Sequence, residues 1–518
     1  MNWDQLLREH ACARGNEAAL IDTLDRRRRT LSYAELNSQV DQVATLLVQS
    51  GLRFGDRVFV AVPMSIELYV SLLALLKLGM AAVLFERSLS RREFRRRLRG
   101  LRPAGMIAGR RTLLIGAAVS SEIRRIPVKI VLGAGVPGTR NWHDARKLAP
   151  HGSYTPIAGD MPAVITLTSG STGVCKAAQR THDFLRAQYV AIRSTFGVRA
   201  GNVEFLTLPL FVLANLAAGA TSVLPDADLR RPANADPMRS VAQIDATRAR
   251  RILVPPALLA KLLDVRASHP NVLRGVEHVF TGGGPVFPAL LDRFDALMPR
   301  SVLHLVYGAT EAEPIASITS GEIDAHDREA MRRGAGLLAG IPVPEIRCRI
   351  LPTPADQTAP ATSRGGTAGT PALRTRGEII VAGPHVLPGY LDTDTDRLAK
   401  IDIDDTRWQR TGDAGAFDDR GRLWLLGRCA ASDGSIYPYE VETPARECPG
   451  VRQAAYVNLN GRGLLAVQPD SGTSARSCVG LLNTLRGLPV DEVTLLRRIP
   501  MDLRHDSKVD YPALVRKL

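Results

Sequence analysis

The chain has 518 residues, 45% of them hydrophobic. This length exceeds what a single hydrophobic core can organise, so the sequence predicts a globular protein of more than one domain. Its formal net charge is +15, and all but eight of its 67 basic residues are arginines. No recognition helix, zinc finger or RNA-binding motif accompanies this charge, which argues against a nucleic-acid-binding protein.

Cysteine spacing and hydropathy give expectations about compartment. The six cysteines show no CxxC spacing, which favours reduced thiols and argues against a disulfide framework or a zinc site. The most apolar window, residues 68–85, is interrupted by Lys77 and Gly79, so we expect a buried helix and a strand there and no transmembrane segment. The N-terminus lacks the apolar stretch of a signal peptide. These features predict a cytoplasmic protein.

Strand-like and helical patterns alternate between about residues 30 and 350. Residues 57–63 and 80–85 are short apolar runs typical of strands, and the apolar segment 65–79 between them is typical of a helix. The arginine-rich runs 25–30 and 90–102 predict solvated surface helices. An alternative for these runs is a docking face for an acidic partner protein or an anionic membrane.

Three later strands run into loops of small residues, at 161–173, 276–285 and 301–311. Ligands of open α/β sheets bind at such strand ends, so we expect α/β layers of mainly parallel strands with a site at these loops. Farther on, residues 352–377 resemble a flexible linker, and 429–436 a hinge.

The loop after the first of these strands carries alternating glycines and hydroxyl residues, followed by Lys176. Glycines allow close approach to a polyphosphate, hydroxyl and amide groups donate hydrogen bonds, and the lysine supplies a cation. The pattern GxxxxGK[ST] of a Walker A loop is absent from the sequence, which disfavours simple P-loop chemistry. The predicted phosphate-binding residues are Thr168, Ser169, Gly170, Ser171, Thr172 and Gly173.

This loop resembles the phosphate loop of the adenylate-forming superfamily, which includes acyl-CoA synthetases, adenylation domains of peptide synthetases and luciferases. Further blocks that resemble the superfamily's motifs follow in the same order. They are Tyr307–Glu311 (YGATE), Trp408–Asp413 (WQRTGD), Gly427–Arg428, Gly434–Glu442 (GSIYPYEVE) and Arg504–Lys508 (RHDSK). The resemblance covers nearly the whole chain and implies an AMP-forming ligase that uses ATP and Mg²⁺.

Each block has residues suited to one part of this chemistry. A hard carboxylate oxygen of Glu311 is suited to Mg²⁺ on the ATP phosphates. Tyr307, with Gly308 and Thr310 beside it, is expected to stack on adenine, and Gly282, Gly283 and Gly284 to let the adenine edge approach the backbone. Asp413 is suited to ribose hydroxyls, and Arg428 to ribose or phosphate. Lys508 is expected to stabilise the charge that gathers at the α-phosphorus, so the predicted catalytic residues are Lys508, Glu311 and Lys176.

Residues 207–226, the hinge stretch and RHDSK also resemble the β-lactone synthetases of bacterial long-chain olefin synthesis. These enzymes adenylate a β-hydroxy acid, whose hydroxyl then closes a four-membered lactone. The chain departs from the usual superfamily pattern at Cys175, Ala177, Val212 and Ala430, and by one position at Gly434. The departures near the hinge put thioester formation in doubt.

We therefore expect an α/β adenylate-forming fold. Residues 1–428 are expected to form the adenylation domain, built of α/β layers with a small β-rich subdomain after the linker, and 429–518 to form a small, mobile α/β cap. The expected reaction activates a fatty or β-hydroxy fatty acid as acyl-AMP and then closes a β-lactone. The apolar segment 205–220 suits an alkyl chain, although it fits a structural core equally well. His182 is a weak candidate for the base that receives the hydroxyl proton.

Two alternatives remain from the sequence. One is a thioester-forming ligase that delivers to CoA or to an acidic carrier protein, with pathway enzymes as further partners. The other is a catalytically impaired relative that acts as a scaffold.

Overall fold

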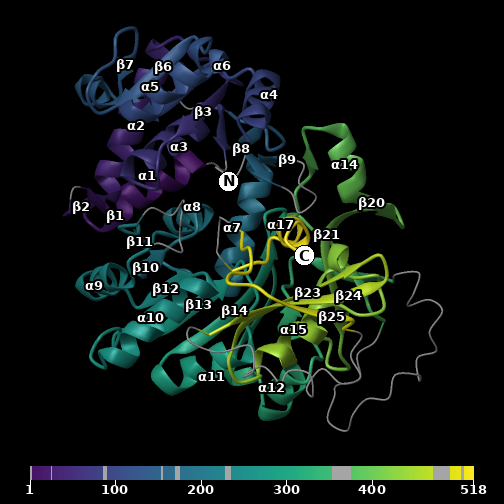
Figure 1. The fold of residues 1–518 in the computed structure, drawn as a ribbon. Coiled ribbons are helices and arrows are strands. Elements are labelled where there is room, and N and C mark those ends of the chain that lie inside the picture. Colours follow the sequence, from purple (N-terminus) through teal and green to yellow (C-terminus); the bar gives the residue numbers. More distant parts are fainter. Residues whose placement is uncertain are drawn as a thin grey trace. The chain divides into compact units, whose positions relative to one another are not determined.

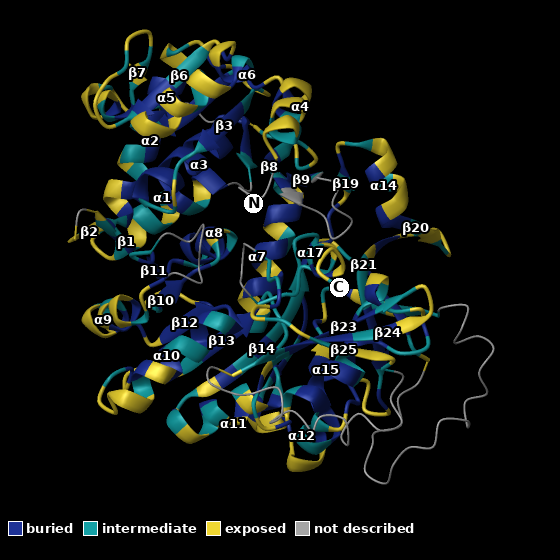
Figure 2. Cartoon of the chain, in the orientation of Figure 1, coloured by how far each residue is buried: buried dark blue, intermediate teal, exposed yellow. Residues whose placement is uncertain are grey.

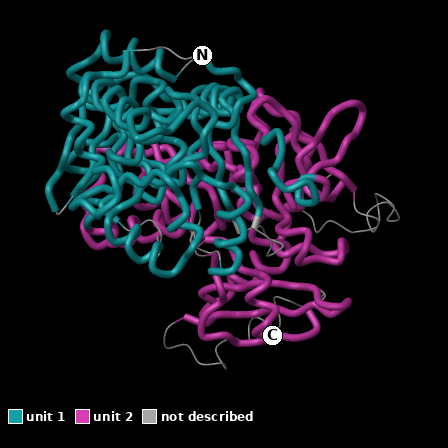
Figure 3. Tube along the Cα trace, turned by 90° about the horizontal axis from the view of Figure 1, so that it is seen from above, with its two compact units in different colours: residues 1–230, 239–253, 387–396 teal, residues 231–238, 254–386, 397–518 magenta. Residues whose placement is uncertain are grey.

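The structure is a computed structural model that describes residues 3–24, 26–85, 90–152, 156–169, 175–227, 235–352, 375–470, 490–502 and 507–518. The chain divides into two compact units (Figure 3). Unit 1 contains residues 1–230, 239–253 and 387–396, and unit 2 contains residues 231–238, 254–386 and 397–518. Most of the predicted linker, residues 353–374, lies outside the described residues.

Unit 1 is built of α/β layers (Figure 1). Its strands are β1 (Ala18–Leu24), β2 (Arg27–Ser32), β3 (Arg57–Ala61), β4 (Ala81–Phe85), β5 (Gly105–Gly109), β6 (Val128–Leu132), β7 (Arg140–Asn141), β8 (Pro162–Ser169), β9 (Cys175–Thr181), β10 (Val203–Leu206), β11 (Thr221–Val223), β12 (Arg251–Val254) and β19 (Gly389–Tyr390). Its helices are α1 (Trp3–Arg14), α2 (Tyr33–Gln49), α3 (Ile66–Lys77), α4 (Arg91–Leu101), α5 (Arg110–Val119), α6 (Ser121–Arg124), α7 (His182–Phe196), α8 (Pro209–Ala218) and α9 (Pro237–Thr247), with the 3₁₀ helix η1 (Trp142–Lys147).

One sheet of unit 1 has the order β19-β9-β8-β4-β3-β5-β6-β7, and the other runs β12-β10-β11-β1-β2. In the first sheet the strands from β8 to β7 are parallel, whereas β9 and β19 are antiparallel additions. The prediction of mainly parallel strands is therefore confirmed for unit 1.

Helix α3 shows why residues 68–85 are not a membrane span. Ser65 caps its first turn by accepting from the Leu68 amide, and every residue of the helix is buried (Figure 2). Its last residue, Lys77, is buried beside the carboxylates of Asp4 and Asp41 and pairs with both. A buried ammonium needs such partners because its desolvation is otherwise costly. The interruption in the apolar run is thus a buried ion-pair site that joins α1, α2 and α3. None of the described helices combines the length and hydropathy that crossing a membrane requires.

The two arginine-rich runs adopt different structures. Residues 90–102 form the predicted surface helix α4, with Ser90 as its N-cap. The prediction of a helix at 25–30 was wrong, because Arg27–Ser32 is strand β2, paired antiparallel with β1. Arg29 is only partly solvated, with 29% of its side chain exposed, because its guanidinium binds the carboxylates of Asp22 and Glu67. Pairing with β1 and these ion pairs outweigh the helix propensity of arginine.

Unit 2 contains a sheet of order β17-β18-β21-β22-β16-β15-β14-β13, with β20 on the side of β21. Its strands are β13 (His278–Gly282), β14 (Val302–Ala309), β15 (Ala312–Thr319), β16 (Leu337–Pro342), β17 (Arg347–Pro352), β18 (Gly377–Ala382), β20 (Lys400–Ile403), β21 (Thr406–Phe417) and β22 (Leu423–Arg428). Helices α10 (Pro256–Ser268), α11 (Pro288–Leu297) and α12 (Ala325–Arg332) accompany it, and α14 (Thr393–Ala399) precedes β20. From β14 onward these strands pair antiparallel. The expectation of mainly parallel strands between residues 30 and 350 was therefore wrong for β14, β15 and β16, whereas β18, β21 and β22 lie where the sequence predicts the β-rich subdomain. Residues 310–311 join β14 to β15, and residues 418–422 join β21 to β22; these connections are too short for the crossovers that parallel strands need.

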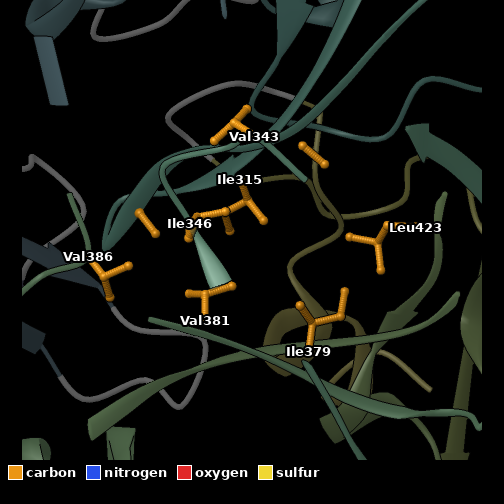
Figure 4. Packing of buried hydrophobic residues seen from close by; sticks show 9 residues of the cluster. Ile315, Val343, Ile346, Ile379, Val381, Val386 and Leu423 are labelled. Atoms are coloured by element: carbon orange, nitrogen blue, oxygen red, sulfur yellow. The ribbon is translucent and has the colours of Figure 1, made fainter. Parts of the chain in front are cut away.

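A buried aliphatic cluster supports this sheet (Figure 4). Ile315 of β15 packs with Ile379 of β18, Leu423 of β22 and their neighbours, and Tyr307 and Ala309 lie against the same cluster. The strand that carries the YGATE block is therefore held on a rigid base.

The C-terminal part of unit 2 has a sheet of its own, β23-β24-β25. Its elements are η4 (Cys429–Ala431), α15 (Pro438–Arg446), β23 (Val451–Leu459), β24 (Arg462–Pro469), β25 (Glu492–Leu495) and α17 (Tyr511–Val515). A large and a small domain agree with the predicted architecture, whereas the boundary between residues 428 and 429 stays a prediction.

Aromatic and cation–π contacts join this C-terminal part to the rest of unit 2. The Arg446 guanidinium lies 3.9 Å from the centroid of the Phe287 ring, and Tyr439 packs edge-on against the same ring at 6.0 Å.

All four tryptophans of the chain are buried: Trp3, Trp142, Trp408 and Trp424. None of them belongs to residues 429–518.

Candidate active site

Strands β13 and β14 are parallel neighbours in unit 2, and Gly282 at the end of β13 pairs with Val306. A Cβ at Gly282 would lie 2.4 Å from the Val306 carbonyl oxygen, and Gly283 has a φ of +77°. Both positions therefore require glycine. The GGG turn thus follows β13 directly beside Tyr307, the next residue of β14.

Asp413 connects the aromatic and cationic residues of the predicted site. Tyr307 Oη donates to Asp413 Oδ2 at 3.0 Å, and Arg428 Nη1 lies 3.1 Å from Asp413 Oδ1. Asp413 and Arg428 are paired residues of β21 and β22, so the strand register itself brings them together. Each carboxylate oxygen thus has one partner.

Charge and burial fix the ionisation of these groups. Burial, with the Asp413 charge second, raises the pKa of Tyr307 well above its usual value, so the phenol remains a donor. The Asp413 carboxylate is the largest cause that raises the pKa of Arg428, and Tyr307, Tyr439 and Glu311 add to it. Glu311 acts on this arginine from the two-residue turn, Thr310–Glu311, that links β14 to β15. The predicted Tyr307, Glu311, Asp413 and Arg428 therefore form one electrostatic cluster.

The end of the chain reaches the GGG turn. A Cβ at Gly284 would lie 2.3 Å from Ser507 Cβ, so the serine occupies the space that the glycine leaves. Ser507 Oγ also accepts from the Ala257 amide at 3.3 Å. That amide lies in the first turn of α10, which starts Pro255-Pro256 and has no side-chain cap of its own.

Asp502 organises the backbone around Lys508. Its Oδ1 accepts from the amides of Ser507 and Lys508, at 3.2 and 3.0 Å, and its own amide donates to the Lys508 carbonyl at 2.8 Å. A bridge between Met501 and Val509 closes this turn. The predicted catalytic lysine therefore directly follows the residue that contacts Gly284. The other members of the block, residues 504–506, lie outside the described residues.

The predicted phosphate loop is described only at its ends. In unit 1, β8 ends at Ser169, β9 starts at Cys175, and these two residues are paired. Gly170, Ser171, Thr172 and Gly173 lie outside the described residues, as do the side chains of Thr168 and Ser169. Lys176 stands opposite Thr168, and its ammonium lies 5.6 Å from the centroid of the Tyr390 ring on β19.

Burial lowers the pKa of His182, at the start of α7, to about 4. Its Nε2 is buried and has no hydrogen-bond partner among the described residues. The imidazole is therefore neutral at pH 7, and its low basicity makes it a poor general base.

The apolar segment 205–220 forms the end of β10 and the buried helix α8 in unit 1. Within it the Asn215 amide donates to Glu204, which also pairs with Arg251. The structure thus assigns this segment a packing role, and its use as an acyl pocket stays a prediction. A hollow of about 480 Å³ in unit 2, lined by the loops at 344–347, 382–384 and 405–407, contains none of the predicted site residues.

Residues 7–391 match the AMP-binding enzyme family. The chain belongs to this family of adenylate-forming enzymes.

Three relatives illustrate the match. The chain is 32% identical to an olefin beta-lactone synthetase of Xanthomonas campestris pv. campestris, over 93% of this chain and 89% of that protein. The amide bond synthetase McbA from Marinactinospora thermotolerans has the same fold, with a TM-score of 0.80, 23% identity and 99% of both chains covered. So does the o-succinylbenzoate coenzyme A synthetase from Bacillus subtilis in complex with ATP and magnesium, with a TM-score of 0.75, 22% identity and 99% of both chains covered.

Several contacts of this adenylate-forming enzyme were not predicted from its sequence. Asp502 and Ser507, which hold the backbone next to Lys508, were missed, as was Tyr390 beside Lys176. Tyr439, whose phenol acts on Arg428, belongs to the GSIYPYEVE block and could have been suspected from that position.

Proposed function

We propose that the chain activates a fatty or β-hydroxy fatty acid with MgATP and then closes the acyl-adenylate to a β-lactone. The activation of an acid as its adenylate follows from the family. The observation that carries the finer proposal is the 32% identity, over nearly the whole chain, to an enzyme named for β-lactone synthesis.

The residues of the cluster in unit 2 fit ATP. The Tyr307 ring beside three successive glycines offers a flat surface next to an exposed backbone, which suits adenine. The Asp413 carboxylate suits ribose hydroxyls, because its two oxygens offer about four acceptor sites, and the hydrogen bond from Tyr307 and the ion pair with Arg428 leave room for further donors. Glu311 offers a hard oxygen for Mg²⁺, which would neutralise charge on the phosphates.

In the first step a carboxylate oxygen of the acid attacks the α-phosphorus of ATP. The new O–P bond replaces the bond to the β-phosphate, and pyrophosphate leaves. The enzyme supplies position and charge, and we assign to Lys508 the stabilisation of the charge that develops at the α-phosphorus. The turn built by Asp502 and Ser507 orients this lysine.

In the second step the β-hydroxyl oxygen of the same molecule attacks the activated carbonyl carbon. A carbon–oxygen ring bond forms, the bond to AMP breaks, and the hydroxyl proton passes to a base. No external acceptor is required, because holding the two groups about 3–3.5 Å apart replaces a second substrate. Solvent or the leaving phosphate fits the role of base better than His182, whose pKa of about 4 makes it weakly basic.

Substitution of Lys508 tests the first step. Lys508→Ala should lower acid-dependent pyrophosphate release about 10²- to 10³-fold while ATP still binds, because the lost charge acts on the transition state. Lys517→Ala, at an exposed lysine of the same tail, is the matched control. Glu311→Gln should raise the Mg²⁺ concentration needed for half-maximal rate. Normal turnover of Lys508→Ala would contradict the assignment of Lys508, whereas no acid-dependent pyrophosphate release by the unaltered chain would favour the scaffold alternative.

Product analysis tests the second step. Enzyme, MgATP and a racemic β-hydroxy fatty acid are incubated without CoA, and the products are identified by mass spectrometry. The expected result is AMP together with a product at the mass of the acid less one water. If AMP forms only after CoA or a carrier protein is added, the chain is a thioester-forming ligase and the lactone proposal is wrong.

A further inference from the structure

A segment of unit 1 outside the predicted site concentrates positive charge. Residues 91–125 contain eleven arginines and two glutamates. Both glutamates are already engaged: Glu93 pairs with Arg96 at 3.2 Å, and Glu122 with Arg99 at 2.7 Å. Ten of the arginines are exposed, namely Arg91, Arg92, Arg95, Arg96, Arg99, Arg102, Arg110, Arg111, Arg124 and Arg125.

Helix α4 is largely exposed (Figure 2). Phe94, Leu98 and Leu101, at helical spacing, pack against the core of unit 1. Exposed arginines occupy most of the remaining positions of the helix, and the exceptions are Glu93, Gly100 and Arg97, which pairs with Asp392. The face that α4 turns to solvent is therefore mainly cationic.

Helix α5 adds an exposed aliphatic face beside this charge. Leu113 points into the core, whereas Leu114, Ile115 and Val119 keep 46%, 53% and 41% of their surface exposed. Isolated exposed aliphatic residues are ordinary, but three on a helix of ten residues form a patch.

The three helices form one continuous surface. The Arg95 guanidinium of α4 donates to the Val119 carbonyl of α5, and Arg124 of α6 donates to the Ala117 carbonyl at 2.6 Å. Figure 1 shows α5 and α6 near β6, and Arg99 of α4 reaches Glu122 of α6. We call the exposed residues of α4, α5 and α6 the basic–aliphatic surface.

We propose that the basic–aliphatic surface docks the enzyme on a lipid bilayer that contains anionic phospholipids. Aliphatic side chains ringed by arginines match the boundary between headgroups and acyl chains, where an amphipathic helix lies in the plane of the membrane. The guanidinium groups bind lipid phosphates and are attracted by anionic headgroups. Arginine is common in protein-binding hot spots as well, but the tryptophan and tyrosine that accompany it there are absent from residues 91–125, so a protein partner is the less suited occupant.

Membrane binding should require both the arginines and the aliphatic residues, because three partly exposed aliphatic side chains insert little apolar surface into the bilayer. Each arginine near an anionic surface contributes about fivefold to the partition constant, and salt screens this contribution. The proposal does not rest on the proposed lactone chemistry, since it concerns where the enzyme binds.

The test is sedimentation of the full-length protein with two kinds of vesicle, phosphatidylcholine alone and phosphatidylcholine with phosphatidylglycerol. We expect binding to the anionic vesicles, weak binding to the neutral ones, and release by high salt. Arg91→Gln/Arg92→Gln/Arg111→Gln should lower the partition constant about 100-fold. The matched control is Arg53→Gln/Arg193→Gln/Arg199→Gln, at exposed arginines elsewhere in unit 1.

A second pair of variants examines the aliphatic component. Leu114→Ser/Ile115→Ser/Val119→Ser should abolish most binding to anionic vesicles at moderate salt, whereas Val190→Ser, at a residue 49% exposed on α7, should not. Equal binding to neutral and anionic vesicles, or no binding to either, would overturn the proposal. The proposal would also be overturned if the arginine and aliphatic variants lost binding to a purified acyl carrier protein but kept their binding to vesicles.

Discussion

The close approach of Gly284 and Ser507 allows Lys508 to be displaced without being changed. In Gly284→Ala the new Cβ would lie 2.3 Å from Ser507 Cβ, whereas carbon atoms in contact are separated by about 3.5–4.0 Å, so the serine must retreat by about 1.2 Å. The backbone at Gly284 does not have a positive φ, so alanine itself is tolerated. Since a misplacement of about 1 Å costs about 100-fold in rate, adenylation should lose about 2.7 kcal/mol of transition-state stabilisation.

The assay is acid-dependent pyrophosphate release, with ATP affinity and thermal midpoint measured in parallel. Gly275→Ala is the matched control, because a Cβ there has no neighbour within 4 Å. Adding Ser507→Gly to Gly284→Ala should recover much of the rate, since the substitution removes both close side-chain atoms, and the carbonyl carbon of residue 507 lies 3.4 Å away. If Gly284→Ala turns over normally, or if Ser507→Gly gives no recovery, Lys508 does not act from this position.

Three further variants probe the site and the cap. Asp413→Asn should weaken ATP binding about 10- to 100-fold in calorimetry, because a hydrogen bond to a charged acceptor is lost, and an unchanged Kd would exclude a ribose contact. Ala430→Pro, at an exposed residue of the predicted hinge, should slow turnover more than it weakens ATP binding, and unchanged kinetics would place the hinge elsewhere. Burial raises the pKa of Glu442 to about 7, so the folded cap binds a proton that the unfolded chain releases near pH 4. Protonated Glu442 therefore stabilises the fold at pH 4, and this stabilisation, about 3 kcal/mol, is lost as the pH rises to about 7. Glu442→Gln should flatten the dependence of the thermal midpoint on pH, and an unaltered pH profile would contradict this explanation.

The predicted nucleotide residues belong to short local motifs on neighbouring strands. Tyr307 follows Val306 on β14, and Asp413 on β21 is paired with Arg428 at the end of β22, so local patterns carry most of the information about this cluster. The contact between Ala257 and Ser507 joins residues 250 positions apart, and no local pattern encodes such a pairing.

The two wrong predictions, of a helix at 25–30 and of parallel strands after residue 302, also concern contacts that local patterns do not encode. The arginines of 27–29 do not themselves reveal a strand, because their pairing with β1 and the carboxylates of Asp22 and Glu67 is tertiary. Likewise, the apolar runs after residue 302 indicate strands, but they do not reveal whether neighbouring strands pair parallel or antiparallel. The predicted linker and most of the phosphate loop lie outside the described residues, and those predictions stand as made.

The distribution of tryptophan offers an optical handle on the cap. All four tryptophans are buried before residue 429, so tryptophan fluorescence reports on the rest of the chain and the predicted cap contributes no tryptophan emission of its own. Phe287, which contacts both Tyr439 and Arg446, is the natural place for a probe. A Phe287→Trp variant would place an indole against the guanidinium of Arg446, and the predicted departure of the cap from that ring would change its emission. Stopped-flow fluorescence could then time cap departure within a single turnover, without labels and without altering a residue of the proposed chemistry.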